Sequence, residues 1–207
     1  MTDVLAPDLR RPLLAPSPPN VPPELRGRLL ELARAALAVA IGKADPSTLD
    51  RAFDAAAGAD EPTAVFVTLT EGGSLRGCIG TLEPVRSLRG AVVAATIDAA
   101  LGDRRFLPVR AAELAGLEIG ISALSELAPL TDVGAFEPGV DGVVVERDGR
   151  RALLLPEVAT ELGWGATEML DAVCDKAGLP ARAWSDERTA LSSFRTIRFG
   201  GPAIVKG

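Results

Sequence analysis

The sequence contains no histidine, and this absence excludes several kinds of catalytic site. A Ser-His-Asp triad, a Cys-His dyad and any zinc or iron site with imidazole ligands cannot be built within the 207 residues. A general acid or base must therefore be a carboxylate, a lysine or a cysteine. Metal ligands would have to be oxygens with at most one sulfur, and no clustered spacing of Asp and Glu indicates such a site. We expect neither a bound metal nor a cofactor.

Cysteines, aromatic residues and long apolar runs are also scarce. Cys78 and Cys174 lie far apart, so no disulfide framework is expected and a cytoplasmic location is predicted. The longest run of small apolar residues, 90–101, is interrupted by Asp98 and is too short to span a membrane. With six Phe, two Trp and no Tyr, the core must be built from Leu, Val, Ile and Ala.

The composition is otherwise that of a globular protein, with 47% hydrophobic and 24% charged residues. The net charge of -6 argues against a nucleic-acid partner, because neutralisation of phosphates supplies most of that affinity. The length fits one large domain or two small lobes.

Local patterns predict a proline-rich flexible leader over residues 1–23, a domain over 24–200 and a tail over 201–207. Periodicity and helix-capping residues predict helices over 24–41, 85–101, 156–162 and 167–177, and a short helix that starts at Asp45-Pro46 with Leu49 and Phe53 facing inward. Alternation and turn residues predict strands over 63–70, 75–82, 114–124, 142–146, 151–155 and 191–199. Because helices and strands mix without a regular βαβ rhythm, we predict an α+β fold with a mixed sheet.

Residues 75–80 (LRGCIG) are the most informative segment, because a cysteine lies between glycines and close to an arginine. Regular alternation would place Leu75, Gly77 and Ile79 toward the core, with Arg76 and Cys78 together on the opposite surface. Glycines in a strand occur where a ligand or another backbone approaches closely. The segment is therefore a candidate site.

Several roles remain open for these side chains. Cys78 is a nucleophile or proton donor, a residue that lines a ligand site, or a packed residue. Arg76 is a clamp for a small anionic ligand or a solvated strand arginine. The remaining candidates for substrate binding are Gly77, Gly80, Asp103 and Arg105. Asp103 and Arg105 could instead cap the loop and form ion pairs at the surface.

The ordered set of motifs resembles the AMME chromosomal-region (AMMECR) domain family over roughly residues 25–199. The motifs that carry the resemblance are LRGCIG at 75–80, RFLP at 105–108, LEI at 117–119, SAL at 122–124, GVVVE at 142–146, RALLLP at 151–156, GW at 163–164, CDKAGLP at 174–180 and Trp184.

This resemblance implies an α+β fold with a larger and a smaller lobe, and places residues 75–80 near the cleft between them. It also implies kinship with the bacterial and archaeal proteins called AmmeMemoRadiSam system protein A, often encoded beside a Memo-like protein and a radical-SAM protein. Family members often carry histidine where this chain has Asp141.

Two functions are consistent with these observations. In the first, the chain is a cytosolic small-molecule enzyme or enzyme component that acts with Memo-like and radical-SAM partner proteins. Arg76 would then orient an anionic substrate and Cys78 would react with it. In the second, the chain is a non-catalytic binding or adaptor module that uses the same surface.

Overall fold

The structure is a computed structural model that describes residues 16–204. The described chain forms two compact units. The larger unit contains residues 18–125 and 196–204, and the smaller unit contains residues 16–17 and 126–195. Most of the predicted leader lies outside the described residues. Within them, no helix combines the length and apolar character needed to cross a membrane.

Three helices belong to the larger unit. They are α1 (Pro23–Ala40), α2 (Pro46–Ala55) and α3 (Leu88–Leu101). Proline opens α1 and α2, where its missing N–H has no intrahelical partner to lose. The side chain of Asp45 caps α2 by accepting from Ser47 N–H, and that of Ser87 caps α3 by accepting from Gly90 N–H. The predicted helices are confirmed, except that α3 begins at this cap rather than at residue 85.

The sheet of the larger unit has the strand order β2-β1-β3-β7, so β2 is an edge strand. The strands are β1 (Ala64–Glu71), β2 (Ser74–Gly80), β3 (Leu117–Leu124) and the second half of β7 (Ala190–Pro202). A short 3-10 turn, Leu114–Gly116, leads into β3. Strand β7 runs past the domain end predicted at residue 200, and Ala203 is buried where its N–H donates to the carbonyl of Leu117.

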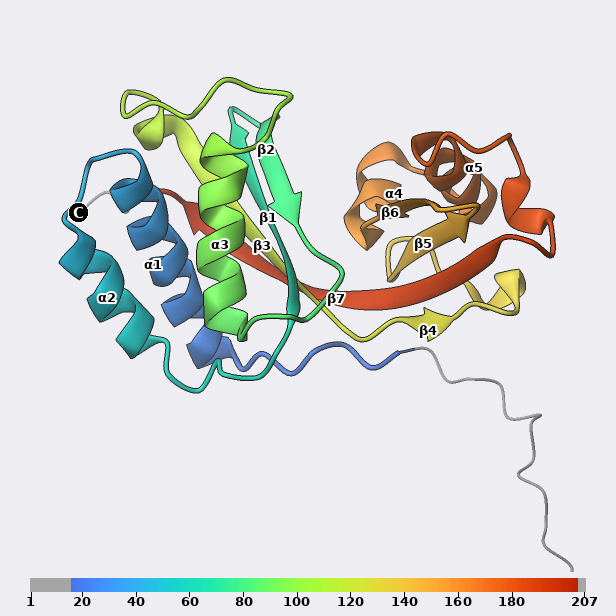
Figure 1. Ribbon diagram of the computed structural model, residues 1–207, viewed down its shortest axis with the longest axis horizontal. Coiled ribbons are helices and arrows are strands. Elements are labelled where there is room, and N and C mark those ends of the chain that lie inside the picture. The colour runs from blue at the N-terminus through green and yellow to red at the C-terminus, as the bar shows by residue number, and fades with distance from the viewer. Residues whose placement is uncertain (1–15, 205–207) are drawn as a thin grey trace, which may run out of the picture. The chain divides into compact units, whose positions relative to one another are not determined.

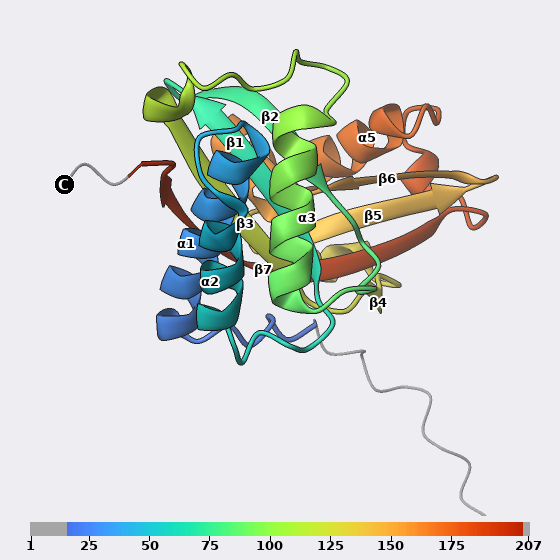
Figure 2. The same cartoon turned by 60° about the vertical axis from the view of Figure 1, so that its left-hand side comes forward.

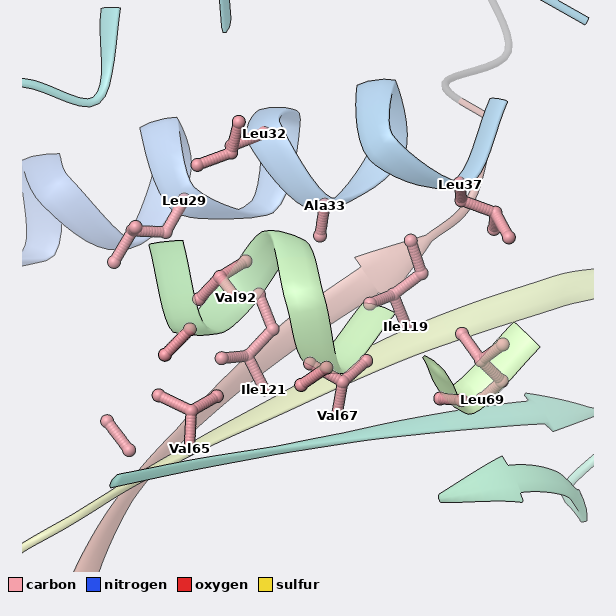
Figure 3. Close-up of a cluster of buried hydrophobic side chains, with 14 of the residues drawn as sticks. Leu29, Leu32, Ala33, Leu37, Val65, Val67, Leu69, Val92, Ile119 and Ile121 are labelled. Atoms are coloured by element: carbon pink, nitrogen blue, oxygen red, sulfur yellow. The ribbon is translucent and has the colours of Figure 1, made fainter. Parts of the chain in front are cut away.

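The core of the larger unit lies between this sheet and its helices (Figure 1). In Figure 1, α1 lies beside α3 and α2 lies on the outer side of α1, and Figure 2 shows α2 in front of α1. Figure 3 shows aliphatic side chains of α1 and α3 facing those of β1 and β3. The labelled residues are fully or almost fully buried: Leu29, Leu32, Ala33, Leu37, Val65, Val67, Leu69, Val92, Ile119 and Ile121. As predicted, the core is aliphatic.

The smaller unit contains antiparallel strands, in which β5 pairs with β6 and with β7, and β4 pairs with β7. Its elements are β4 (Ala128–Pro129), a 3-10 turn (Val133–Ala135), β5 (Asp141–Arg147), β6 (Arg150–Leu154), α4 (Pro156–Leu162), α5 (Ala166–Lys176), a second 3-10 turn (Ala183–Ser185) and the first half of β7. The hairpin predicted at residues 148–149 joins β5 to β6. Gly142 lies under the ring of Phe194, which occupies the space that a side chain would need.

The α+β prediction is confirmed. The strand pairs differ in one respect from the mixed sheet that we expected, because every pair of named strands is antiparallel. Hairpins join β1 to β2 and β5 to β6, whereas the other antiparallel pairs bring together strands that are distant in the sequence.

Candidate functional site

The register of the larger sheet assigns side chains to its two faces. Directly paired residues of antiparallel strands point to the same side. One continuous row is Cys78, Thr68, Gly120 and Gly200, taken from β2, β1, β3 and β7 in turn. The flanking rows add Phe66 and Leu75 and several polar residues. We call the following set the polar face, on the side of the sheet away from the core: Thr68, Thr70, Cys78, Glu118, Gly120, Ser122, Arg198 and Gly200.

A β-bulge interrupts the pairing of β1 with β2. Leu69 pairs with Gly77, but the next residue, Thr70, pairs with Leu75, which leaves Arg76 as the extra residue. The bulge turns Leu75 out of the core, and it is 44% exposed. The prediction that it faces the core is therefore wrong, because regular alternation stops at Arg76. The prediction is correct for Gly77, which is buried, and for Ile79, which packs against the core.

The thiol of Cys78 lies opposite Thr68. The distance from its Sγ to the Oγ1 of Thr68 is 3.3 Å, and Cys78 is a free cysteine that is partly buried. The backbone N–H of Cys78 donates away from β1, to Asp103. Thr68 and Cys78 are therefore a non-hydrogen-bonded pair of the antiparallel ladder, in which the two side chains lie close together.

Asp103 and Arg105 hold the outer side of β2 at Cys78. The carboxylate of Asp103 accepts from the N–H of Cys78 at 2.9 Å and from Nη2 of Arg105 at 2.6 Å. Arg105 in turn donates to the carbonyl oxygen of Cys78 at 3.3 Å. Both backbone groups that an edge strand would leave unpaired are thus satisfied. The Arg105 guanidinium, together with the Cys78 N–H, holds the pKa of the buried Asp103 carboxyl well below its usual range.

Arg76 makes a different set of contacts. Its Nε donates to Oε1 of Glu113 at 2.7 Å and its Nη2 donates to Oε2 at 3.3 Å, which is a two-point ion pair. Both side chains are about 15% exposed, and the pairing lowers the pKa of Glu113. The guanidinium also lies 5.9 Å from the ring centre of Phe106, which Arg105 approaches at 5.5 Å. These two hydrogen bonds leave Nη1 of Arg76 unused, and this nitrogen is buried without a hydrogen-bond partner.

Gly77 and Gly80 allow close approach of backbone rather than access to the sulfur. A Cβ at Gly77 would overlap the carbonyl oxygen of Ala99 in α3. A Cβ at Gly80 would overlap the carbonyl oxygen of Val65 and the side chain of Phe66. A glycine in a strand leaves room for a ligand or for another stretch of backbone. At Gly77 and Gly80 that space is taken by neighbouring backbone.

A pocket of about 310 Å³ lies on the polar face. Its lining residues are Thr68, Thr70, Glu118, Ile119, Gly120, Arg198, Phe199, Gly200 and Gly201. Thr68 therefore touches both the pocket and the thiol of Cys78. Sequence reasoning missed this pocket. Alternation in β3 already places Glu118 and Gly120 opposite the core residues Ile119 and Ile121, but the neighbouring strands were not evident from the sequence.

A second pocket of about 240 Å³ lies between β1, β2 and α3. Ile79, Ala91 and Ala95 give it a more apolar lining, and Glu83 and Asp98 lie at it as well. It belongs to the helix-covered side of the sheet, so the polar face and the helix side each have a pocket.

The smaller unit holds two groups singled out from the sequence. Asp141 is buried, and its Oδ1 lies 3.0 Å from Nε of Arg195, its partner residue on β7. Cys174 is fully buried in the core of this unit, and burial raises the pKa of its thiol. Over residues 16–204, no cluster of three or more Cys, Asp or Glu side chains is arranged to hold a metal ion.

Comparisons with known proteins give a consistent picture. The AMMECR1 family matches residues 30–199. A protein of Methanothermobacter thermautotrophicus is 47% identical over 141 residues, which is 65% of this chain and 73% of the relative. A protein of Aeropyrum pernix is 39% identical over 143 residues, and the chain spans 62% of its length. The crystal structure of the uncharacterized protein PH0010 from Pyrococcus horikoshii is similar with a TM-score of 0.76 and 31% identity, covering 87% of this chain and 93% of that one.

Proposed function

The chain belongs to the AMMECR1 family, and we propose that it is a cytosolic enzyme component that binds a small molecule on its polar face, beside Cys78. In this proposal the pocket holds the ligand and the thiol acts at the edge of the pocket. A general base from histidine is excluded by the sequence, so the thiol would react directly or donate its proton.

The observation that carries the proposal is the position of Thr68. Its hydroxyl lies 3.3 Å from the sulfur of Cys78, and the same side chain lines the pocket. A ligand in the pocket would thus be separated from the thiol by no more than one small side chain. Pockets with a few convergent polar groups are the usual places where small ligands bind.

Asp103 and Arg105 support this site by positioning rather than by contact with the ligand. Their hydrogen bonds to both backbone groups of Cys78 fix the strand edge that carries the thiol. Arg76 supports it from the other side of the bulge through its ion pair with Glu113. A role of Arg76 as a clamp for an anionic ligand stays a prediction, and its buried Nη1, which makes no hydrogen bond, is the group available for it.

A partnership with a Memo-like protein and a radical-SAM protein completes the proposal. It rests on the resemblance of the ordered motifs. Purified partner proteins from the same organism, mixed with this chain, give a direct test. Co-elution with the wild-type chain supports the partnership, and three separate elution peaks at micromolar concentrations argue against it.

A second candidate is a binding or adaptor module without catalysis. Two ion pairs at residues 75–80 favour it, because Arg76 and Arg105 each face a carboxylate. It is also favoured by Leu107, which is 82% exposed next to Phe106 in the loop that contacts β2. In this case the thiol could be replaced by a hydroxyl without loss of partner binding or of function.

Alkylation of the native protein separates the alternatives for Cys78. With iodoacetamide at neutral pH, followed by peptide mass spectrometry, we expect Cys78 to be modified and Cys174 to be protected until denaturant is added. Cys174 serves as an internal control because it is fully buried. Protection of Cys78 to the same extent as Cys174 would overturn the proposed role. If Cys78→Ser retained full function in cells, the adaptor would be favoured.

A further inference from the structure

Two apolar side chains of the larger unit are more exposed than any other large apolar side chain of residues 16–204. Leu107 is 82% exposed and Val85 is 72% exposed. Leu107 lies in the loop that follows α3, whereas Val85 lines the pocket between β1, β2 and α3. We infer that two copies of this chain associate, with Leu107 of each copy placed in this pocket of the other. The inference does not depend on the proposed function, because neither residue belongs to the polar face.

The backbone of the loop is fixed on both sides of Leu107. On one side, the N–H of Phe106 donates to the carbonyl oxygen of Asp103 at 3.0 Å. On the other side, the N–H of Val109 donates to the carbonyl oxygen of Ala100 at 2.8 Å, and the Val109 side chain is buried. The loop therefore presents its exposed leucine in a defined position. Little backbone freedom is lost when a partner covers this side chain, which favours binding.

The pocket has the size and the lining to hold a leucine side chain. Its volume is about 240 Å³, and a cavity of about 150 Å³ is already large enough for benzene. The apolar residues that line it are Val65, Ile79, Val85, Ala91, Ala94 and Ala95. Removing a leucine side chain from water in such a place corresponds to about a tenfold or greater gain in affinity.

The loop brings positive charge to the contact. Residues 104–110 contain three arginines and no acidic residue, although the net charge of the whole chain is -6. Arg105 and Arg110 already pair with carboxylates of their own chain. Arg104 is exposed, and among the described residues it has no hydrogen-bond or ion-pair partner. Arg104 is therefore the guanidinium that is available to a second chain.

The pocket has an excess of negative charge. Glu83 and Asp98 line it and are exposed, and their carboxylates make no hydrogen bond or ion pair within residues 16–204. Arg86 is the single cation of the same lining. The apolar tip and the charge of the loop thus both match this pocket, and one chain carries both parts. Charge complementarity of this kind favours a second copy as the occupant.

Reciprocal contacts would close the pair. The loop and the pocket both belong to the larger unit, and α3 runs from one to the other. In a dimer with two-fold symmetry each copy gives its loop to the pocket of the other, so both contacts form together. The area involved is small, and we therefore expect a dissociation constant above about 1 µM.

Sedimentation velocity of the full chain, from about 5 to about 500 µM, tests the inference. We expect monomers at the lowest concentration and dimers at the highest. Leu107→Ser should weaken dimerisation at least about tenfold, because it removes the apolar side chain from the contact. Leu162→Ser is the matched control, since Leu162 is an exposed leucine of the smaller unit, and it should leave dimerisation unchanged.

An exchange of charges tests whether the contacts are reciprocal. Arg104→Glu should dimerise at least about fivefold more weakly than the wild type, and so should the double variant Glu83→Lys with Asp98→Lys. An equimolar mixture of the two variant proteins should associate as well as the wild type. In the mixture each loop again meets a pocket of opposite charge.

The inference is overturned if the wild-type chain stays monomeric up to about 500 µM, or if Leu162→Ser weakens dimerisation as much as Leu107→Ser does. It is also overturned if the mixture of charge variants associates no better than either variant alone. Assemblies that grow beyond a dimer would contradict the reciprocal contact. None of these results bears on Cys78, whose labelling tests the proposed function separately.

Discussion

Strands β1 and β3 have two faces of opposite character. On the helix side, Val67 and Ile121 are fully buried against α1 and α3 (Figure 3). On the polar face, Thr68 and Gly120 belong to a pocket and to the row that contains the thiol. Because side chains alternate along a strand, the same segments hold the fold together and present polar groups. Changes on one face should therefore affect stability, and changes on the other should affect binding.

The glycines of the two faces show the same contrast. Gly77 is needed because α3 passes directly over it, with the carbonyl of Ala99 in the space of a side chain. Gly120 has room for a side chain. Packing against α3 explains Gly77, whereas Gly120 lines the pocket on the polar face.

The largest effect is expected on the helix side. Ile121→Ala should lower the free energy of unfolding by about 2–5 kcal/mol, because it removes buried methyl and methylene groups and leaves a cavity. Thr68→Ala, directly beyond Val67 on the opposite face, should cost less than about 1 kcal/mol. Urea denaturation followed by circular dichroism measures both. Equal losses would mean that the polar face is as tightly packed as the core.

Next in size is the effect of a single methyl group on the two glycines. Gly77→Ala should destabilise by about 1–3 kcal/mol or more, because backbone of α3 must move to accommodate the new Cβ. Gly120→Ala should stay within about 0.5 kcal/mol of the wild type. The same denaturation experiment applies. A stable Gly77→Ala variant would contradict the close approach of α3.

Asp103 links stability to pH at the strand edge. Its pKa is lowered in the folded state, so its contribution is present above the unfolded pKa of about 3.9 and is lost as pH falls below it. At pH 7, Asp103→Asn should cost about 1.5–3 kcal/mol, since the charged hydrogen bonds to Arg105 are lost.

Urea denaturation between pH 7 and pH 3 measures this linkage. The difference between wild type and Asp103→Asn should narrow below about pH 4, because the Asp103 carboxyl of the unfolded chain becomes protonated there while the pKa of the folded carboxyl lies lower. Asp98→Asn, at an exposed position of α3, is the control and should change stability by less than about 0.5 kcal/mol. A difference that is constant with pH would show that the charge of Asp103 is unimportant.

The smallest effect concerns the bulge. Leu75→Thr should change the free energy of unfolding by no more than about 0.5 kcal/mol, because Leu75 is 44% exposed. Ile79→Thr, four residues further along the same strand, should cost about 1–3 kcal/mol, because Ile79 packs against the core. A large loss for Leu75→Thr would indicate regular alternation and no bulge.

Much of the fold was predictable because it depends on local signals. Proline and Asp45 at the start of α2, the glycine after α4 and the alternation in β3 are each sufficient to place an element within a few residues. The two glycines after β1 likewise indicated its turn to β2. Strand direction was not predictable in this way, because it depends on which strands become neighbours.

The candidate site was predictable only in part. The segment 75–80 indicated Cys78, and the charged loop that follows α3 indicated Asp103 and Arg105. The fold brings both charged residues against the strand edge that carries Cys78. The partner of Arg76 was missed, since Glu113 is 37 residues away. The pocket was missed for the same reason, because its lining comes from β1, β3 and β7.

By itself, the sequence determined the α+β class, the aliphatic core and the absence of imidazole chemistry, since composition and short-range periodicity are properties of the chain alone. Only the tertiary structure decided that Arg76 is paired, that Leu75 faces outward, and that Thr68 joins the thiol to a pocket. The physical reason is that register and bulges set which distant residues meet. One extra residue in a strand moves the side chains of the residues beyond it to the opposite face of the sheet.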